Sequence, residues 1–128
     1  KRKINTGADL VTTQLFFDNS TYFNFKQNSK KHGIEVPILP GLLSVSSLEQ
    51  AQRFCDMCGS HLPLALKKQL KDATGDRIAC EKIGSDWIFS QAKELLENGA
   101  PGIHLYILNK AKPAIDLIDR LRSVGFYR

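Results

Sequence analysis

The chain has 128 residues, of which 42% are hydrophobic and 24% charged, a balance typical of a globular protein with a core of its own. No apolar run approaches the roughly 20 residues that cross a bilayer, and polar residues rather than a signal-peptide stretch follow Lys1-Arg2-Lys3. We therefore expect no membrane partner. Three cysteines, an odd number, argue against a disulfide framework, so we expect a cytoplasmic protein.

The net charge of +5 does not by itself indicate nucleic-acid binding. The densest basic stretch, residues 26–32, is far along the chain from Lys67 and Lys71, and acids such as Glu35 and Asp72 lie between and beside them. A nucleic-acid surface normally gathers basic residues on one face with aromatic residues among them. We therefore interpret these residues as solvated helix surface and expect no nucleic-acid partner.

The first half of the chain predicts two strands and two helices. A β-rich strand at residues 10–17 precedes Asp18, Asn19 and Ser20, which supply cap chemistry for a helix through about residue 31 that Gly33 ends. A second strand, at residues 36–39, is expected to stop at Pro40-Gly41. The spacing Ser46-x-x-Glu49 is typical of a capping box and predicts a helix that reaches residue 58.

The second half continues the same alternation. Pro63 suits the first turn of a helix that runs to about residue 73. The remaining predicted elements are a long helix at 76–98, a strand at 102–108 and an amphipathic helix at 113–124. This rhythm predicts βαβ units in a parallel α/β sheet, in a single domain over residues 1–128. Because a (β/α)₈ barrel typically has about 250 residues, three strands suggest a piece of a larger fold.

Side-chain alternation in the strands predicts where a ligand could bind. On the first strand, one face carries Val11, Thr13, Leu15 and Phe17 and the other carries Thr12, Gln14 and Phe16. On the last strand, the aliphatic face carries Ile103, Leu105 and Ile107 and the other carries His104, Tyr106 and Leu108. The aliphatic sets suit packing on helices, so Gln14 and Tyr106 are expected to point inward. A buried amide or phenol without a partner costs about 1–3 kcal/mol, so either a ligand or a neighbouring group or water must satisfy them.

Three ordered segments carry a further signal over nearly the whole chain. They are Thr12-Thr13-Gln14-Leu15-Phe16-Phe17-Asp18 with Tyr22-x-x-Phe25, then Gly33-Ile34-x-Val36-Pro37-Ile38-Leu39-Pro40-Gly41, and His104-Leu105-Tyr106-Ile107-Leu108-Asn109-Lys110. Their order and separations resemble those of the methylenetetrahydrofolate reductases. The resemblance implies a (β/α)₈ TIM barrel that binds FAD, with this chain as its C-terminal part supplying the last three strands.

The resemblance also implies roles for individual residues. Gln14 matches a glutamine that hydrogen-bonds the folate ring, where an amide suits a pterin edge because it offers a donor and an acceptor side by side. Gln50 matches a second folate-contacting glutamine, and Phe54 matches an aromatic residue that packs on the substrate or the nicotinamide nucleotide. Tyr106 is expected to help position the substrate. Lys110 stands where the family usually has an arginine for the glutamate tail, so the charge is kept and the bidentate fork lost.

Arg2 and Lys3 match a basic pair near the FAD phosphates, with an exposed charged segment as the alternative. No glutamate here occupies the position of the family's general acid, so we expect no catalytic residue in this chain and no activity from it alone. On the helix predicted to reach residue 58, Gln50 and Phe54 share one face, apart from a core-facing stripe of Leu48, Ala51, Cys55 and Cys58. In that position the two cysteines are small buried residues, and a metal or redox site is the weaker interpretation.

The implied function is that of an oxidoreductase of one-carbon metabolism. It passes a hydride from NADH or NADPH to FAD and then to 5,10-methylenetetrahydrofolate, which gives 5-methyltetrahydrofolate, and a homo-oligomer is expected. Two alternatives stay open: another TIM-barrel enzyme that binds a pterin or a phosphate, and a non-catalytic interaction fragment. Flavin absorbance of the complete protein separates the first function from the other two.

Overall fold

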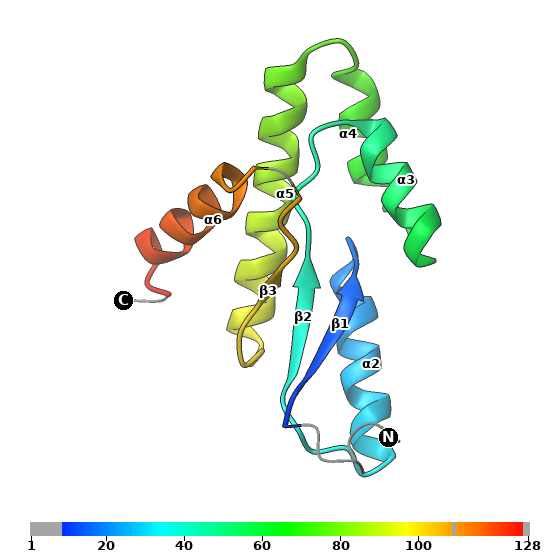
Figure 1. The fold of residues 1–128 in the computed structure, drawn as a ribbon, viewed down its shortest axis with the longest axis vertical. Coiled ribbons are helices and arrows are strands. Elements are labelled where there is room, and N and C mark those ends of the chain that lie inside the picture. Colours follow the sequence, from blue (N-terminus) through cyan, green and yellow to red (C-terminus); the bar gives the residue numbers. More distant parts are fainter. Residues whose placement is uncertain (1–8, 109, 127–128) are drawn as a thin grey trace.

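The computed structural model describes residues 9–108 and 110–126. In chain order the elements are β1 (Val11–Leu15), α2 (Asn19–Lys31), β2 (Ile38–Leu42), α3 (Leu48–Cys58), α4 (Leu64–Asp72), α5 (Arg77–Glu97), β3 (His104–Leu105) and α6 (Lys112–Ser123). The strands are parallel and lie in the order β1-β2-β3, which confirms the α/β class and the parallel sheet. Helices α2 and α5 run along one face of this sheet, and α3 and α4 lie beyond the carboxyl ends of its strands (Figure 1).

Two buried clusters hold these layers together. The helix-side cluster lies between the sheet and the helices α2, α5 and α6, and consists of Phe16, Tyr22, Ile38, Leu42, Ile88, Ala92, Leu95, Leu117 and Leu121. The end cluster lies where α3, α4 and the start of α5 meet the ends of β1 and β2, and consists of Leu15, Phe17, Leu43, Val45, Ala51, Cys55, Leu62, Leu66, Leu70 and Cys80. Among the helices of the described ranges, none is long and apolar enough to span a membrane.

The helix ends follow from short polar side chains and glycine. Asp18 caps α2 as predicted, because its carboxylate accepts a hydrogen bond from the Ser20 N–H. The cap of α3 is Ser47 rather than Ser46, so the predicted start was wrong by one residue. Gly59 ends α3 with φ of 66°, a left-handed conformation that glycine adopts at little cost.

The second strand differs most from its prediction. Residues 36–39 were expected to form it and Pro40-Gly41 to stop it, but β2 begins at Ile38 and continues through both residues to Leu42. Thr12 pairs with Leu39 and Leu15 with Gly41, so β1 has one residue more than β2 between these pairs. Proline cannot donate to a strand ladder, and in sheets it is tolerated at such bulges.

The extra residue reverses the faces predicted for the end of β1. Val11 and Phe16 both pack into the helix-side cluster, whereas Leu15 and Phe17 belong to the end cluster. The prediction that Phe16 points inward with Gln14 was therefore wrong, because simple alternation holds only for a strand without a bulge. The predicted strand at 102–108 is also shorter, and Ile107, expected on the helix-packing face, is 55% exposed.

Tyr22 of α2 ties the helix layer to the sheet. Its side chain is buried, and its hydroxyl donates a 2.7 Å hydrogen bond to the Ile38 carbonyl oxygen. Tyr22→Phe is expected to lower the free energy of unfolding by about 1–2 kcal/mol, because that carbonyl loses a buried partner.

Burial also raises the pKa of Tyr22 above its ordinary value of 10.0. The unfolded chain therefore releases the Tyr22 proton at lower pH than the folded chain. The stability that protonated Tyr22 contributes is accordingly lost as the pH rises above 10.0. Denaturant unfolding of both proteins at about pH 8 and about pH 11 is expected to show the difference between them shrinking at the higher pH. A difference that stays constant between the two pH values contradicts the expected titration.

Candidate functional site

Gln14 lies near the carboxyl end of β1, and its side chain is exposed. Within the described part of the chain its amide has no hydrogen-bond partner, although its backbone carbonyl accepts a 3.0 Å bond from the Thr13 hydroxyl. An amide in this state keeps two donors and an acceptor available for a ligand. Of the two polar residues predicted to point inward, Gln14 is the one whose side chain no other described residue satisfies.

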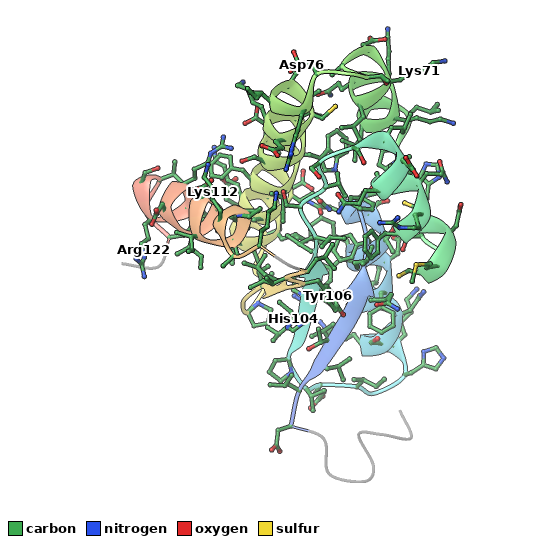
Figure 2. All side chains as sticks on the ribbon, turned by 45° about the horizontal axis from the view of Figure 1, so that its top comes forward. Lys71, Asp76, His104, Tyr106, Lys112 and Arg122 are labelled. Atoms are coloured by element: carbon green, nitrogen blue, oxygen red, sulfur yellow. The ribbon has the colours of Figure 1, made fainter. Side chains whose placement is uncertain are left out.

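Tyr106, which follows β3, has a different environment. Its hydroxyl donates a 2.9 Å hydrogen bond to the Thr13 carbonyl oxygen, so a neighbouring group satisfies the phenol. Its ring packs on the end cluster and meets the His104 ring edge-to-face, with 4.6 Å between centroids (Figure 2). Tyr106 therefore joins the last strand to the first, and the half-buried side chain leaves part of its surface for a ligand.

Gln50 lies in the first turn of α3 and is half-buried. Its backbone N–H donates to the Ser47 hydroxyl at 3.0 Å, while its side-chain oxygen accepts from the Ser46 N–H at 2.8 Å. This reciprocal arrangement resembles a capping box built on Ser47-x-x-Gln50, a spacing that the sequence also contains. The oxygen of Gln50 is thus used by the helix end, and the amide nitrogen remains for a ligand.

Phe54 lies one turn after Gln50 on α3, as predicted. Its ring is half-buried and packs against the end cluster, and the Arg53 guanidinium lies 5.7 Å from the ring centroid. The expectation that Phe54 stands apart from the core stripe is therefore only partly correct, because its ring shares the cluster to which Ala51 and Cys55 belong. The remaining exposed part of the ring is available to cover a ligand.

Phe54→Ala is expected to lower the free energy of unfolding by about 1–2 kcal/mol, less than the 3–5 kcal/mol of a fully buried phenylalanine. In the complete protein it should also raise the Michaelis constant for folate or for the pyridine nucleotide. Thermal unfolding and substrate kinetics, measured side by side, test both effects. Phe54→Leu is the matched control, since it keeps the apolar contact with the core and loses the flat ring. A large loss of stability with unchanged Michaelis constants makes Phe54 purely structural.

One of the three charged residues of the predicted site lies within the described part of the chain. Lys110 is exposed in the segment between β3 and α6, where its ammonium can meet a carboxylate. Arg2 and Lys3, predicted to lie near FAD phosphates, fall outside the described residues.

The cysteines of α3 favour the structural interpretation. Cys55 is buried and Cys58 half-buried, and burial raises the pKa of the Cys55 thiol, with smaller contributions from Asp56 and Cys58. A raised pKa keeps the thiol protonated, whereas metal binding and redox reactivity need the thiolate. Within residues 9–108 and 110–126, no group of three or more His, Cys, Asp or Glu side chains could hold a metal ion.

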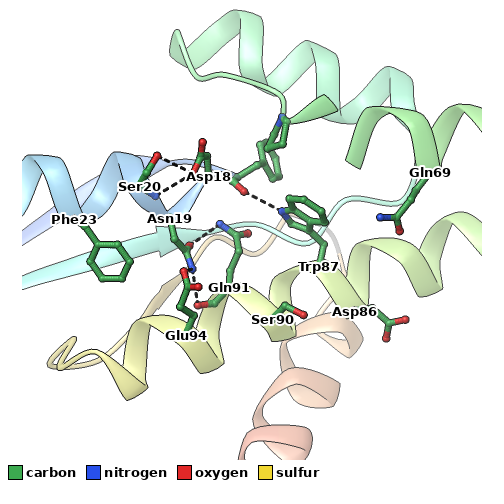
Figure 3. A pocket seen from close by; sticks show the side chains of 12 residues that line it. Asp18, Asn19, Ser20, Phe23, Gln69, Asp86, Trp87, Ser90, Gln91 and Glu94 are labelled. Atoms are coloured by element: carbon green, nitrogen blue, oxygen red, sulfur yellow. Dashed lines mark hydrogen bonds between the residues drawn. The ribbon is translucent and has the colours of Figure 1, made fainter. Parts of the chain in front are cut away.

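Sequence reasoning missed a polar connection between α5 and the end of β1. The Gln91 side chain, 5% exposed, donates to the carbonyl oxygen of Phe16 at 3.2 Å, and the Trp87 indole donates to that of Phe17 at 2.9 Å. Both residues line an open groove of about 700 Å³ between α2, α4 and α5 (Figure 3). The signal was present in the sequence, because Gln91 lies between Trp87 and Leu95 at the core spacing of the helix. These bonds hold the segment that follows Gln14.

A family model described as methylenetetrahydrofolate reductase matches residues 1–122 of this chain. The chain belongs to the methylenetetrahydrofolate reductase family. Among its methylenetetrahydrofolate reductase relatives, an NADH-dependent enzyme by name from Arabidopsis thaliana is 31% identical over 121 residues, and the Escherichia coli K12 enzyme is 33% identical over 112 residues. These alignments cover 94% and 88% of this chain but only 20% and 38% of the relatives, so the chain spans a minor part of their length.

A solved structure gives the same picture of the fold. An uncharacterized protein from Clostridium thermocellum, described as binding two copies of 5-methyl-5,6,7,8-tetrahydrofolic acid, superposes with a TM-score of 0.59 at 19% identity. The match covers 96% of this chain and 46% of the other. At this identity the similarity establishes a shared fold over the region.

Proposed function

We propose that this chain is part of an enzyme that reduces 5,10-methylenetetrahydrofolate to 5-methyltetrahydrofolate with NADH or NADPH. The observation that carries the proposal is the family match over residues 1–122, which contains the exposed amide of Gln14, without a hydrogen-bond partner among the residues that the structure describes. Gln14 occupies the position where the family resemblance implies contact with the folate ring. Oxidoreduction of a folate in one-carbon metabolism is the activity that the names of the relatives support.

We further propose that the chain is the C-terminal part of a (β/α)₈ barrel, as one incomplete domain. The parallel strands follow each other in the sheet in sequence order, as in a barrel, and helices cover one face (Figure 1). On the other face Thr12, Gln14 and His104 are exposed, and the remaining strands of a barrel would enclose them. Gln14, Tyr106 and α3 lie toward the carboxyl ends of the strands, the side on which barrel enzymes bind their substrates.

In this proposal the residues bind and orient the folate rather than exchange protons with it. Gln14 binds the pterin edge through its amide, and Gln50 adds its free amide nitrogen. The exposed parts of the Phe54 and Tyr106 side chains provide apolar contact. Lys110 attracts the carboxylates of the glutamate tail as a point charge, without the paired hydrogen bonds of an arginine.

FAD is the cofactor that we propose for the complete enzyme, and when bound it supplies the hydride-transfer chemistry. The exposed amide of Gln14 fits a flat ring with alternating donors and acceptors, a property that flavin and pterin rings share. Arg2 and Lys3 would hold its phosphates through charge-assisted hydrogen bonds.

The test is the activity of the complete protein purified with its flavin. We expect flavin absorbance and oxidation of NADH or NADPH that depends on methylenetetrahydrofolate. The 128-residue polypeptide alone is expected to show no activity above background, because in this proposal the general acid and part of the flavin pocket belong to the rest of the barrel. A complete protein without flavin, or one that does not consume methylenetetrahydrofolate, overturns the proposal.

A further inference from the structure

The pairing between β1 and β2 is interrupted beside Gln14. Pro40, in the middle of β2, has no N–H to donate. The next N–H, that of Gly41, donates to the side-chain hydroxyl of Thr13 at 2.9 Å. A hydrogen bond to a side chain therefore joins the two strands at the position where β1 carries its extra residue.

The Thr13 hydroxyl is used in both directions. It accepts from the Gly41 N–H and donates to the carbonyl oxygen of Gln14 at 3.0 Å, so it joins β2 directly to the backbone of Gln14. On the other side of Thr13, its carbonyl oxygen accepts the Tyr106 hydroxyl at 2.9 Å. Three hydrogen bonds thus meet at the bulge: one within β1, one from β2 and one from Tyr106, which follows β3.

Gly41 makes this convergence sterically possible. A Cβ at Gly41 would lie 2.6 Å from the Thr13 carbonyl oxygen and 2.7 Å from Cε2 of Tyr106, closer than real Cβ contacts. The absence of a side chain lets the Tyr106 ring cross β2 and reach β1. The bulge therefore depends on a glycine at position 41, because only with a glycine there can the Tyr106 ring approach closely enough to bond to Thr13.

We infer that Thr13 is a positioning residue for Gln14. The Thr13 hydroxyl stabilises the bulge, and the bulge presents the Gln14 amide to the folate. At the bulge Gln14 is exposed, and the next residue, Leu15, is 5% exposed and belongs to the end cluster. Without the hydroxyl, the Gly41 N–H and the Gln14 carbonyl lose their partner, and Gln14 is free to turn. The inference rests on the proposed folate-binding role of Gln14.

A double-mutant cycle in the complete protein tests it, with the dissociation constant of 5-methyltetrahydrofolate as the readout. Thr13→Val removes the hydroxyl and keeps the shape of the side chain, and Gln14→Leu removes the amide. We expect Thr13→Val to weaken binding by roughly 3- to 10-fold in the native background and by less than about twofold when Gln14 is already leucine. Thr13→Ser, which keeps the hydroxyl, should bind within about twofold of the native protein.

Each outcome has a defined meaning. An equal effect of Thr13→Val in both backgrounds, or no effect beside a clear effect of Gln14→Leu, overturns the inference while the folate site stands. If Gln14→Leu itself leaves binding unchanged, the proposed role of Gln14 fails first. If Thr13→Val does not fold, Tyr106→Phe takes its place in the cycle, because it releases the same bulge through the Thr13 carbonyl.

Discussion

Replacing Gly84 with alanine is expected to lower the free energy of unfolding by about 2–4 kcal/mol, although alanine is the better helix former. Gly84 is buried in α5, where the helix crosses the segment that leaves β2. A Cβ there would overlap the carbonyl oxygen of Val45 and lie 2.8 Å from its carbonyl carbon. Because the obstructing atoms belong to the backbone, no side chain can rotate away, and the helix or the segment after β2 must move.

The intrinsic preference of helices for alanine over glycine, about 1 kcal/mol, works in the opposite direction, so the sign of the result is informative. Ser90→Ala, at an exposed position of the same helix, is the matched control and should change stability by less than about 0.5 kcal/mol. Denaturant unfolding of the two variants and the native protein measures both values. A more stable Gly84→Ala protein contradicts the close packing of α5 on Val45.

The second large effect is expected on folate turnover. In the complete enzyme, Gln14→Leu should lower kcat/KM for methylenetetrahydrofolate by roughly 5- to 150-fold, the equivalent of about 1–3 kcal/mol for one hydrogen-bonding group. Flavin content should change less, because the amide is proposed to contact the pterin. Stability should also be nearly unchanged, since the side chain is exposed and has no partner in the described part of the chain.

Two further variants sharpen this result. Gln14→Glu keeps the size and an acceptor but loses the amide donors and adds a charge, so it reports whether the ligand needs a donor. Gln52→Leu, at a half-buried position of α3, removes an amide whose partner is Asp56, and it should leave folate kinetics unchanged. Normal kinetics of Gln14→Leu with subsaturating folate removes Gln14 from the site.

Local rules account for the elements that were predicted correctly. The cap at Asp18, the glycine end of α3 and the helical spacing of α5 each depend on residues within one or two turns, which the sequence displays directly. The resemblance to the methylenetetrahydrofolate reductases rests in the same way on short segments in order, and the family match confirmed it. The prediction that the strand stops at Pro40-Gly41 failed because it applied a local rule to residues whose conformation depends on a neighbouring strand.

The sequence by itself determined the α/β class, most of the helix positions, the family and the choice of Gln14 as a candidate ligand-binding residue. Only the tertiary structure decided how Gln14 is presented and which groups around it are already used. The reason is the length of the connections involved: the bond from Gly41 to Thr13 spans 28 residues and that from Tyr106 to Thr13 spans 93. Strand register arises from such distant contacts, so alternation along one strand could not reveal the bulge that puts Phe16 in the helix-side cluster.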